Sequence, residues 1–168
     1  MSLVLKRISK QGFEPHTVID VGVGNGTQEL YSAFPSASLF LVEPLLEFEE
    51  TIQSIMSQRQ GGYVIAAAGS SDAVQTINVH ENHLEGSSLF NELTSTIDDG
   101  EPREISVVTL DGLVDDNDLG NPYLIKVDAQ GYELEVMQGA LSVLKSTEVV
   151  ILEVLLTSFL LKIQFFTT

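Results

Sequence analysis

The chain of 168 residues contains no cysteine. This absence excludes disulfide bonds, a thiol nucleophile and a cysteine-based metal site, and it is compatible with the cytoplasmic location that we predict. Basic residues are scarce as well, because eight lysines and arginines stand against 24 aspartates and glutamates, which gives a formal net charge of −16. Proteins that bind DNA or RNA neutralise phosphates with lysine and arginine, so this balance argues against nucleic acid as a partner.

Long hydrophobic runs are also missing. The first ten residues mix charged and apolar side chains, so they lack the apolar core of a signal peptide. The apolar residues 154–161 are too few and too interrupted for a membrane span. With 43% hydrophobic residues, however, the chain can bury a core. We therefore predict a single globular domain over residues 1–168.

The most informative stretch lies at residues 18–27, where an apolar run meets an aspartate and three alternating glycines: Asp20, Gly22, Gly24 and Gly26. This order is typical of the strand–turn–helix entry of a nucleotide-binding α/β fold, since glycine lets the backbone turn sharply and approach a ligand. The dinucleotide pattern G-x-G-x-x-G would need glycine where Thr27 or Glu29 stands. The stretch resembles D-x-G-x-G-x-G instead, the first motif of Rossmann-like methyltransferases that use S-adenosylmethionine. An ordinary glycine-rich turn is the alternative.

A second acidic residue follows at a matching distance. Residues 38–42 form a continuous apolar run suited to a buried parallel strand, and this run ends at Glu43. An acid about 20 residues past a glycine loop, at the end of the second strand, can accept hydrogen bonds from ribose hydroxyls. The alternative for Glu43 is a carboxylate favoured by the N-terminus of the following helix.

Strand and helix patterns alternate along the remaining chain. Helices are predicted over residues 3–10, 27–34, 44–60, 110–114 and 132–145, and strands over residues 63–68, 75–80, 104–108, 123–127 and 148–152. The strand at 104–108 alternates like an edge strand, whereas the strand at 148–152 is apolar like a buried one. The helix at 132–145 has a predicted core stripe of Leu134, Met137, Leu141 and Leu144.

This alternation predicts an α/β fold with a doubly wound, mainly parallel sheet. We expect an N-terminal helix within residues 1–13, a Rossmann-like core over residues 17–153 and an atypical apolar tail at residues 154–168.

Four acidic residues stand at the ends of predicted strands: Asp20, Glu43, Asp128 and Glu153. Open α/β sheets bind ligands outside the carboxyl ends of their strands, so we expect these carboxylates to share one rim. Crowded like charges cost energy, and an adenosyl ligand with a positive sulfonium would offset part of that cost. Solvated loop carboxylates or helix caps are the alternatives at Asp128 and Glu153.

With these motifs the chain resembles the FkbM-like methyltransferase family. The matching segments follow the family's order: residues 18–27, 40–44, 67–72, 86–89, 108–111, 125–133 and 139–140. The most distinctive is Lys-Val-Asp-x-Gln-Gly-x-Glu at residues 126–133, with Gly-Ala closing the same predicted helix. The resemblance implies a class I methyltransferase fold, S-adenosylmethionine as donor, and usually O-methylation of a hydroxyl on a sugar or other small molecule.

The resemblance also implies roles for individual residues. The cofactor would be held by Asp20, Gly22, Gly24, Gly26 and Glu43. Asp72 would lie near the adenine, and Glu133 would help to shape the active site. A hydroxyl acceptor benefits from a general base, for which Asp128 is the first choice and Glu153 the second.

A divalent metal held by rim carboxylates could activate the hydroxyl in place of a base. No metal site is predicted, however, because His80 and His83 have no third ligand at a recognisable spacing.

The end of the chain departs from the family pattern. Members normally continue past the fifth strand with a helix and an antiparallel strand pair, whereas 15 residues follow Glu153. We expect this strand pair to be lacking, and the apolar edge to associate with a second copy or to accept the tail as one added strand. Two other functions remain open: a shortened relative that binds S-adenosylmethionine with little or no catalysis, and a nicotinamide-dependent oxidoreductase, which the loop spacing disfavours.

Overall fold

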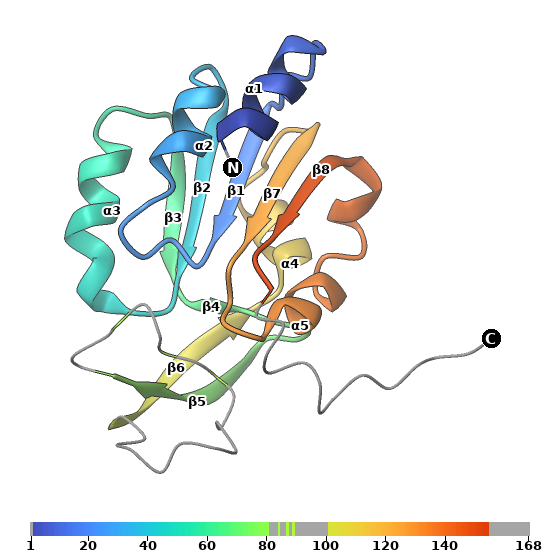
Figure 1. Ribbon diagram of the computed structural model, residues 1–168. Coiled ribbons are helices and arrows are strands. Elements are labelled where there is room, and N and C mark those ends of the chain that lie inside the picture. Colours follow the sequence, from blue (N-terminus) through green and yellow to red (C-terminus); the bar gives the residue numbers. More distant parts are fainter. Residues whose placement is uncertain (1, 81–83, 85–86, 88, 90–100, 155–168) are drawn as a thin grey trace.

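The computed structural model describes residues 2–80, 84, 87, 89 and 101–154. Its centre is a sheet of five parallel strands in the order β3-β2-β1-β7-β8 (Figure 1). The strands are β1 (Thr17–Val21), β2 (Ser38–Glu43), β3 (Gly61–Ile65), β7 (Tyr123–Val127) and β8 (Thr147–Leu152). Because the strand order reverses at β1, the sheet is doubly wound, and the predicted Rossmann-like α/β fold is confirmed.

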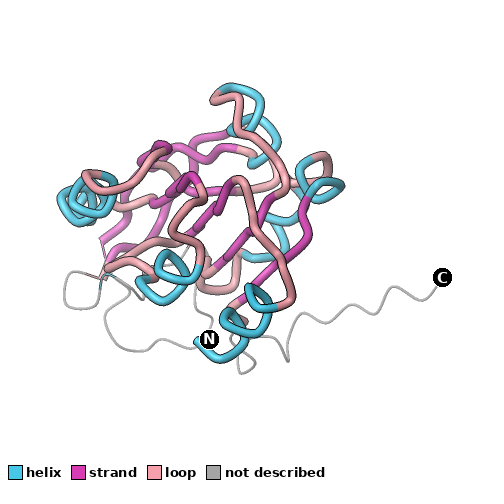
Figure 2. The backbone as a smooth tube through the Cα atoms, turned by 90° about the horizontal axis from the view of Figure 1, so that it is seen from above, coloured by secondary structure: helices cyan, strands magenta, loops and turns pink. Residues whose placement is uncertain are grey.

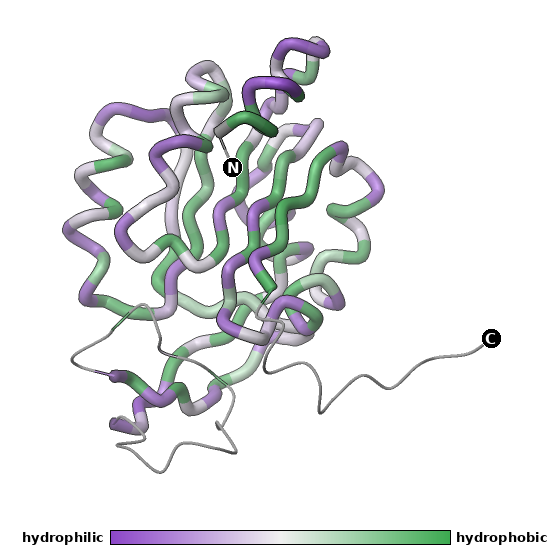
Figure 3. The backbone as a smooth tube through the Cα atoms, in the orientation of Figure 1, coloured by the Kyte–Doolittle hydropathy of each residue, from purple (hydrophilic) through white to green (hydrophobic). Residues whose placement is uncertain are grey.

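Helices cover both faces of this sheet (Figure 2). One face packs against α1 (Ser2–Lys10), α2 (Gln28–Ala33), η1 (Leu46–Phe48) and α3 (Glu49–Met56), and the other against α4 (Leu110–Asp116), α5 (Glu133–Gln138) and η3 (Val143–Ser146). Since both faces are covered, every residue of β1 and β7 is buried. Figure 3 shows the resulting contrast between largely hydrophobic central strands and helices of mixed hydropathy.

A second, three-stranded sheet lies beyond the carboxyl ends of the central strands (Figure 1). It contains β4 (Ala67–Ala68), β5 (Ala73–Val79) and β6 (Glu101–Val108) in the order β4-β6-β5, with β5 antiparallel to β6. The strand predicted at 63–68 is therefore divided between two sheets. The prediction of an edge strand at 104–108 is wrong, because β6 is the middle strand of this sheet.

The helix predicted over residues 132–145 is interrupted. It stops at Gln138 because the next residue, Gly139, packs directly on the backbone of Gly69: a Cβ there would lie 1.9 Å from the Gly69 carbonyl oxygen. The chain turns at this contact and resumes as η3. Half of the predicted core stripe is consequently wrong, since Leu134 and Leu141 are 60% and 64% exposed. The buried positions are Val136, Ala140 and Val143.

The helix predicted at 44–60 is also shorter than expected. It consists of η1 and α3, ends at Met56, and is followed by Gly61 and Gly62 at the start of β3. Gly61 has a φ of +127°, and its Cβ would lie 1.8 Å from the Leu39 carbonyl oxygen. The two glycines therefore bring β3 close to β2.

Strand β8 is the outer strand of the central sheet among the described residues. Its side chains alternate between partly buried and exposed, with Val150 and Leu152 on the exposed face, so the prediction of a buried strand is wrong. The expectations for residues 155–168 and for most of residues 81–100, His83 included, lie outside the described residues. No helix in the described ranges is long and apolar enough to cross a membrane.

Candidate active site

A cavity of about 680 Å³ opens at the carboxyl end of the central sheet. Its walls come from the segments that follow β1, β2, β7 and β8, and from β4 and β5 of the second sheet. This is where open α/β sheets bind ligands, and the volume is typical of a small-molecule site. The predicted site residues that line it are Gly22, Gly24, Gly26, Glu43, Asp128 and Glu153.

The glycine loop after β1 forms one wall of the cavity. Gly22, Gly24 and Gly26 have φ angles of +74°, +49° and +90°, in the left-handed region that side chains disfavour. A Cβ on Gly22 would lie 1.8 Å from the Asp128 carbonyl oxygen, and a Cβ on Gly26 would lie 2.7 Å from Cδ1 of Ile55. At these two positions the close neighbour is the protein itself rather than the ligand that the glycine pattern predicts.

Glu43 fastens this loop to the end of β2. Its Oε2 accepts a hydrogen bond from the Gly24 N–H at 2.9 Å, and its Oε1 accepts one from the Leu45 N–H at 3.0 Å. The residue is 4% exposed. Burial raises the pKa of the Glu43 carboxyl, although both backbone N–H groups act against that shift. Glu43 is thus in the cavity wall as predicted, with both oxygens also engaged by the loops beside it.

Asp20 lies behind the cavity and is not one of its lining residues. The carboxylate is fully buried, and its Oδ2 accepts a hydrogen bond of 2.6 Å from the Tyr31 hydroxyl. Its Oδ1 lies 3.2 Å from the Nζ atom of Lys126. Burial and the adjacent Asp20 carboxylate raise the pKa of Tyr31. The structure therefore gives Asp20 internal partners at the base of the glycine loop.

Lys126 belongs to this site although the motif analysis gave it no role. Its Nζ donates a hydrogen bond of 3.0 Å to the Gly22 carbonyl oxygen and lies 3.8 Å from Oδ2 of Asp128. A signal was present in the sequence, because Lys126 and Asp20 are the charged residues of two apolar strands, each one position before the strand end. Strands β1 and β7 are adjacent and parallel, with these two residues in register, so their side chains meet.

Asp128 directly follows β7 and lines the same cavity as Glu43. Its N–H donates to the Val21 carbonyl oxygen, and its Oδ1 accepts a hydrogen bond of 3.0 Å from the Gln130 side-chain amide. The side chain is 24% exposed. This placement agrees with the expectation that Asp128 shares a rim with Glu43.

The charges around Asp128 act on it in both directions. Burial is the largest influence and raises the pKa of the Asp128 carboxyl. The ammonium of Lys126 lowers it, and three carboxylates raise it again, those of Glu153, Glu133 and Asp20. The net effect is a carboxyl that takes up a proton more readily than an exposed aspartate does.

The two remaining acids differ in their access to the cavity. Glu153 follows β8, is exposed and lines the cavity. Glu133 opens α5, is 3% exposed and does not line it. The Oε1 atom of Glu133 accepts hydrogen bonds from the N–H groups of Ala129 and Gly131, at 3.2 and 2.9 Å. Its Oε2 is buried with no hydrogen-bond partner in the described structure. Glu133 therefore holds the turn that carries Asp128.

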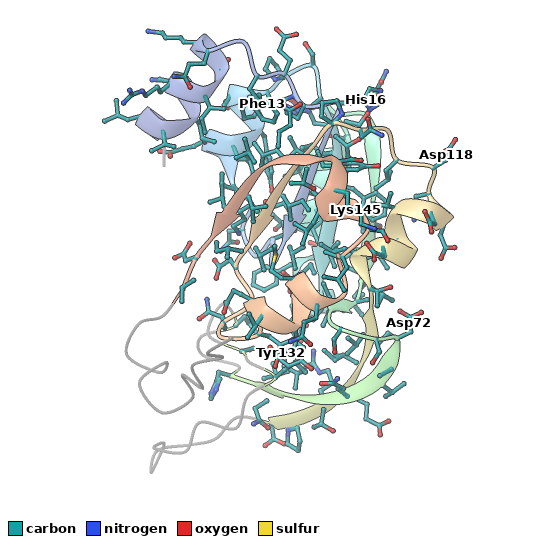
Figure 4. All side chains as sticks on the ribbon, turned by 90° about the vertical axis from the view of Figure 1, so that its right-hand side faces the viewer. Phe13, His16, Asp72, Asp118, Tyr132 and Lys145 are labelled. Carbon is teal, nitrogen blue, oxygen red and sulfur yellow. The ribbon has the colours of Figure 1, made fainter. Side chains whose placement is uncertain are left out.

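Asp72 lies outside the cavity, on the side of the molecule that carries α4 (Figure 4). It is exposed, and its Oδ1 accepts a hydrogen bond of 2.9 Å from the N–H of Thr109, the residue that caps α4. One turn later, Asp111 donates its N–H to the Gly139 carbonyl, and its carboxylate accepts the N–H groups of Ser142 and Val143. The motifs at 67–72, 108–111 and 139–140 thus hold one another together.

The cavity is rich in negative charge and hydrogen-bond acceptors. Four carboxylates and one ammonium line it: Glu29, Glu43, Asp128, Glu153 and Lys126. Carboxylates accept hydrogen bonds from hydroxyl groups and attract a positive charge strongly where water is partly excluded. A carboxyl with a raised pKa is also a suitable proton acceptor at neutral pH. The arrangement therefore suits a cationic cofactor beside a hydroxyl compound.

Comparison with known proteins gives a consistent result. Residues 14–165 match the family model described as the methyltransferase FkbM domain. One relative, named hexuronic acid methyltransferase AglP, from Haloferax volcanii, is 24% identical over 151 residues, which is 90% of this chain. The chain spans 61% of that relative's length. No solved structure matches.

Proposed function

Because the chain belongs to the FkbM methyltransferase family, we propose that it transfers a methyl group from S-adenosylmethionine to a hydroxyl of a small molecule or sugar. The observation that carries this proposal is one cavity whose wall joins the glycine loop, Glu43 and Asp128. The methyltransferase relative adds support, although its named acceptor, a hexuronic acid, belongs to that protein.

The residues present fit S-adenosylmethionine. The left-handed glycine loop and the buried carboxylate of Glu43 lie side by side, joined by the Gly24 hydrogen bond. They would hold the nucleoside end, with Glu43 accepting ribose hydroxyls through lone pairs that the backbone leaves free. Asp20 and Asp72 would support the cofactor site without touching it, because neither lines the cavity.

When bound, the cofactor supplies an electrophilic methyl group on a positively charged sulfur. The protein then has two tasks, which are to place the acceptor oxygen in line with that methyl and to remove the hydroxyl proton. Asp128 is the proposed base, because it faces the cavity and its raised pKa suits proton uptake. Glu153 is the second candidate, being exposed at the same rim.

Calorimetric titration tests the cofactor assignment. We expect S-adenosylhomocysteine, the demethylated product, to bind with one site per chain, and we expect no binding of NAD. Binding of NAD alone would support the nicotinamide-dependent oxidoreductase instead and would overturn the proposal.

A labelled-methyl assay on a panel of glycosides tests the base. Asp128→Asn should lower the transfer rate by about a hundredfold or more while the affinity for S-adenosylhomocysteine changes little. An unchanged rate would remove Asp128 from this role, and the same assay on Glu153→Gln would then examine the second candidate.

A further inference from the structure

The cavity identifies the charge class of acceptor that it can take. We propose, resting on the proposed function above, that the acceptor is an uncharged hydroxyl compound, and that the site rejects acceptors bearing a carboxylate or phosphate beside the reacting hydroxyl. The inference comes from where this chain places its few basic residues relative to the carboxylates of the cavity.

The cavity has one basic side chain among its described lining residues, and that side chain is already engaged. The ammonium of Lys126 contacts Oδ1 of Asp20 at 3.2 Å and the Gly22 carbonyl oxygen at 3.0 Å, and the side chain is 5% exposed. Pulling this ammonium toward an anionic acceptor would leave the Asp20 carboxylate buried without its counter-ion, which is costly. Lys126 is therefore a poor anchor for an incoming anion.

The other basic residues have different positions or partners. Lys6, Arg7 and Lys10 lie in α1, beyond the amino ends of the strands and so at the opposite end of the sheet from the cavity (Figure 1). Lys145 lies in η3, directly before the amino end of β8, and Figure 4 shows it far from Tyr132, which lines the cavity.

The two arginines of the described chain have partners of their own. Arg59 donates hydrogen bonds to three backbone carbonyls at the end of α2 and before β2, those of Tyr31, Phe34 and Ala37. Arg103 forms an ion pair of 2.7 Å with Glu47. Residues 81–100, part of which also line the cavity, contain no lysine or arginine.

The acceptor side of the cavity instead presents carboxylates and an aromatic ring. Asp128 and Glu153 lie at its rim, and Tyr132 forms part of its wall, held by a hydrogen bond of 3.1 Å from its hydroxyl to Gln75. A polyol or sugar can donate hydroxyl hydrogen bonds to these carboxylates and place its carbon skeleton against the ring. A second carboxylate at the same place would be repelled by both acids.

Two analogues of S-adenosylmethionine test this charge selection without knowledge of the acceptor. One replaces the transferable methyl by carboxymethyl, and the other replaces it by carbamoylmethyl, which has the same shape but no negative charge. Both project their new group into the acceptor space. Calorimetry at pH 8 should show the carbamoylmethyl analogue binding at least about tenfold more tightly than the carboxymethyl analogue.

The double variant Asp128→Asn, Glu153→Gln should reduce that ratio to about threefold or less. The matched control is Glu148→Gln, which removes a carboxylate from the opposite end of β8 and should leave the ratio unchanged. Equal binding of the two analogues to the wild-type chain would overturn the inference, as would a ratio that the double variant does not change. Failure of S-adenosylhomocysteine itself to bind would overturn the proposed function, and the inference with it.

Discussion

The two loops that meet at the cavity are each held by a buried glutamate, but the two glutamates are bound differently. Glu43 comes from another strand and uses both oxygens, one for Gly24 in the loop after β1 and one for Leu45. Glu133 follows its own loop directly and uses one oxygen for both of its N–H donors. The loop after β1 therefore depends on how β1 and β2 are placed, whereas the turn after β7 is closed within six residues of chain.

The two loops also contact each other, at Gly22 and Asp128. This contact leaves no room for a side chain, and Lys126 reinforces it from below by binding the Gly22 carbonyl oxygen. Any change that separates the loops should therefore affect both the cofactor half and the acceptor half of the proposed site. The following variants separate the long-range contacts from the local ones.

The largest effect is expected for Gly22→Ala. The new Cβ would lie 1.8 Å from the Asp128 carbonyl oxygen, at a φ of +74°. We expect the free energy of unfolding to fall by more than about 4 kcal/mol, measured by urea denaturation. The matched control is Gly12→Ala, which has a φ of +89° but no atom within 4 Å of the added Cβ. It should cost only the backbone strain, about 1–2 kcal/mol. Equal losses in both variants would show that loop contact is unimportant.

The next effect is expected for Lys126→Met, which removes the cation between the loops. Asp20 would remain fully buried with a charge and without its ion-pair partner. We expect a loss of about 3 kcal/mol in the free energy of unfolding. Adding Asp20→Asn should recover more than half of that loss, because the buried charge is then gone. A double variant as unstable as the sum of the two single variants would contradict this account.

Glu43→Gln and Glu133→Gln compare the two clasps directly. A glutamine has one acceptor oxygen, so at position 43 one of the two backbone N–H groups loses its partner, whereas at position 133 the single oxygen in use can be kept. We expect Glu43→Gln to lower the free energy of unfolding by about 1–2 kcal/mol and to weaken S-adenosylhomocysteine binding. Glu133→Gln should change both quantities by less than about 0.5 kcal/mol. The reverse order would mean that the local clasp is the more important one.

The smallest effect is a pH dependence. Burial raises the pKa of Glu43 above 4.5 and that of Asp128 above 3.8. An acid whose folded pKa is raised contributes stability that is fully present below its unfolded pKa and is lost as the pH rises through its folded pKa. The difference in unfolding free energy between the wild type and Asp128→Asn should therefore fall from pH 4 to pH 8, measured by urea denaturation.

Glu47→Gln serves as a control of opposite sign in the same measurement. Slight burial acts to raise the pKa of Glu47, but its backbone N–H and Arg103 lower it overall. Its contribution is therefore present above pH 4.5 and lost at lower pH. A wild-type advantage over Glu47→Gln that moved in the same direction as that over Asp128→Asn would contradict the assigned shifts.

Much of this protein could be predicted from local sequence. The apolar runs at 38–42 and 123–127 form strands, and the glycines after Asp20 form the loop, because these features depend on neighbouring residues alone. The distance from Gly22 to Glu43 spans one strand–helix–strand unit, so it also predicted that the acid and the loop would meet. The placement of Asp128 followed from its position directly after a buried strand.

Tertiary structure decided which of these residues face the cavity and which face other parts of the protein. Asp20 is buried because Lys126 stands beside it on a strand far away in sequence, and Asp72 is turned to Thr109 by the second sheet. Leu134 and β8 are exposed, although their apolar patterns predict burial, because nothing in the described structure packs on those faces. A local pattern specifies a side chain's character and its element, but burial and partners depend on elements that the fold brings together from distant parts of the chain.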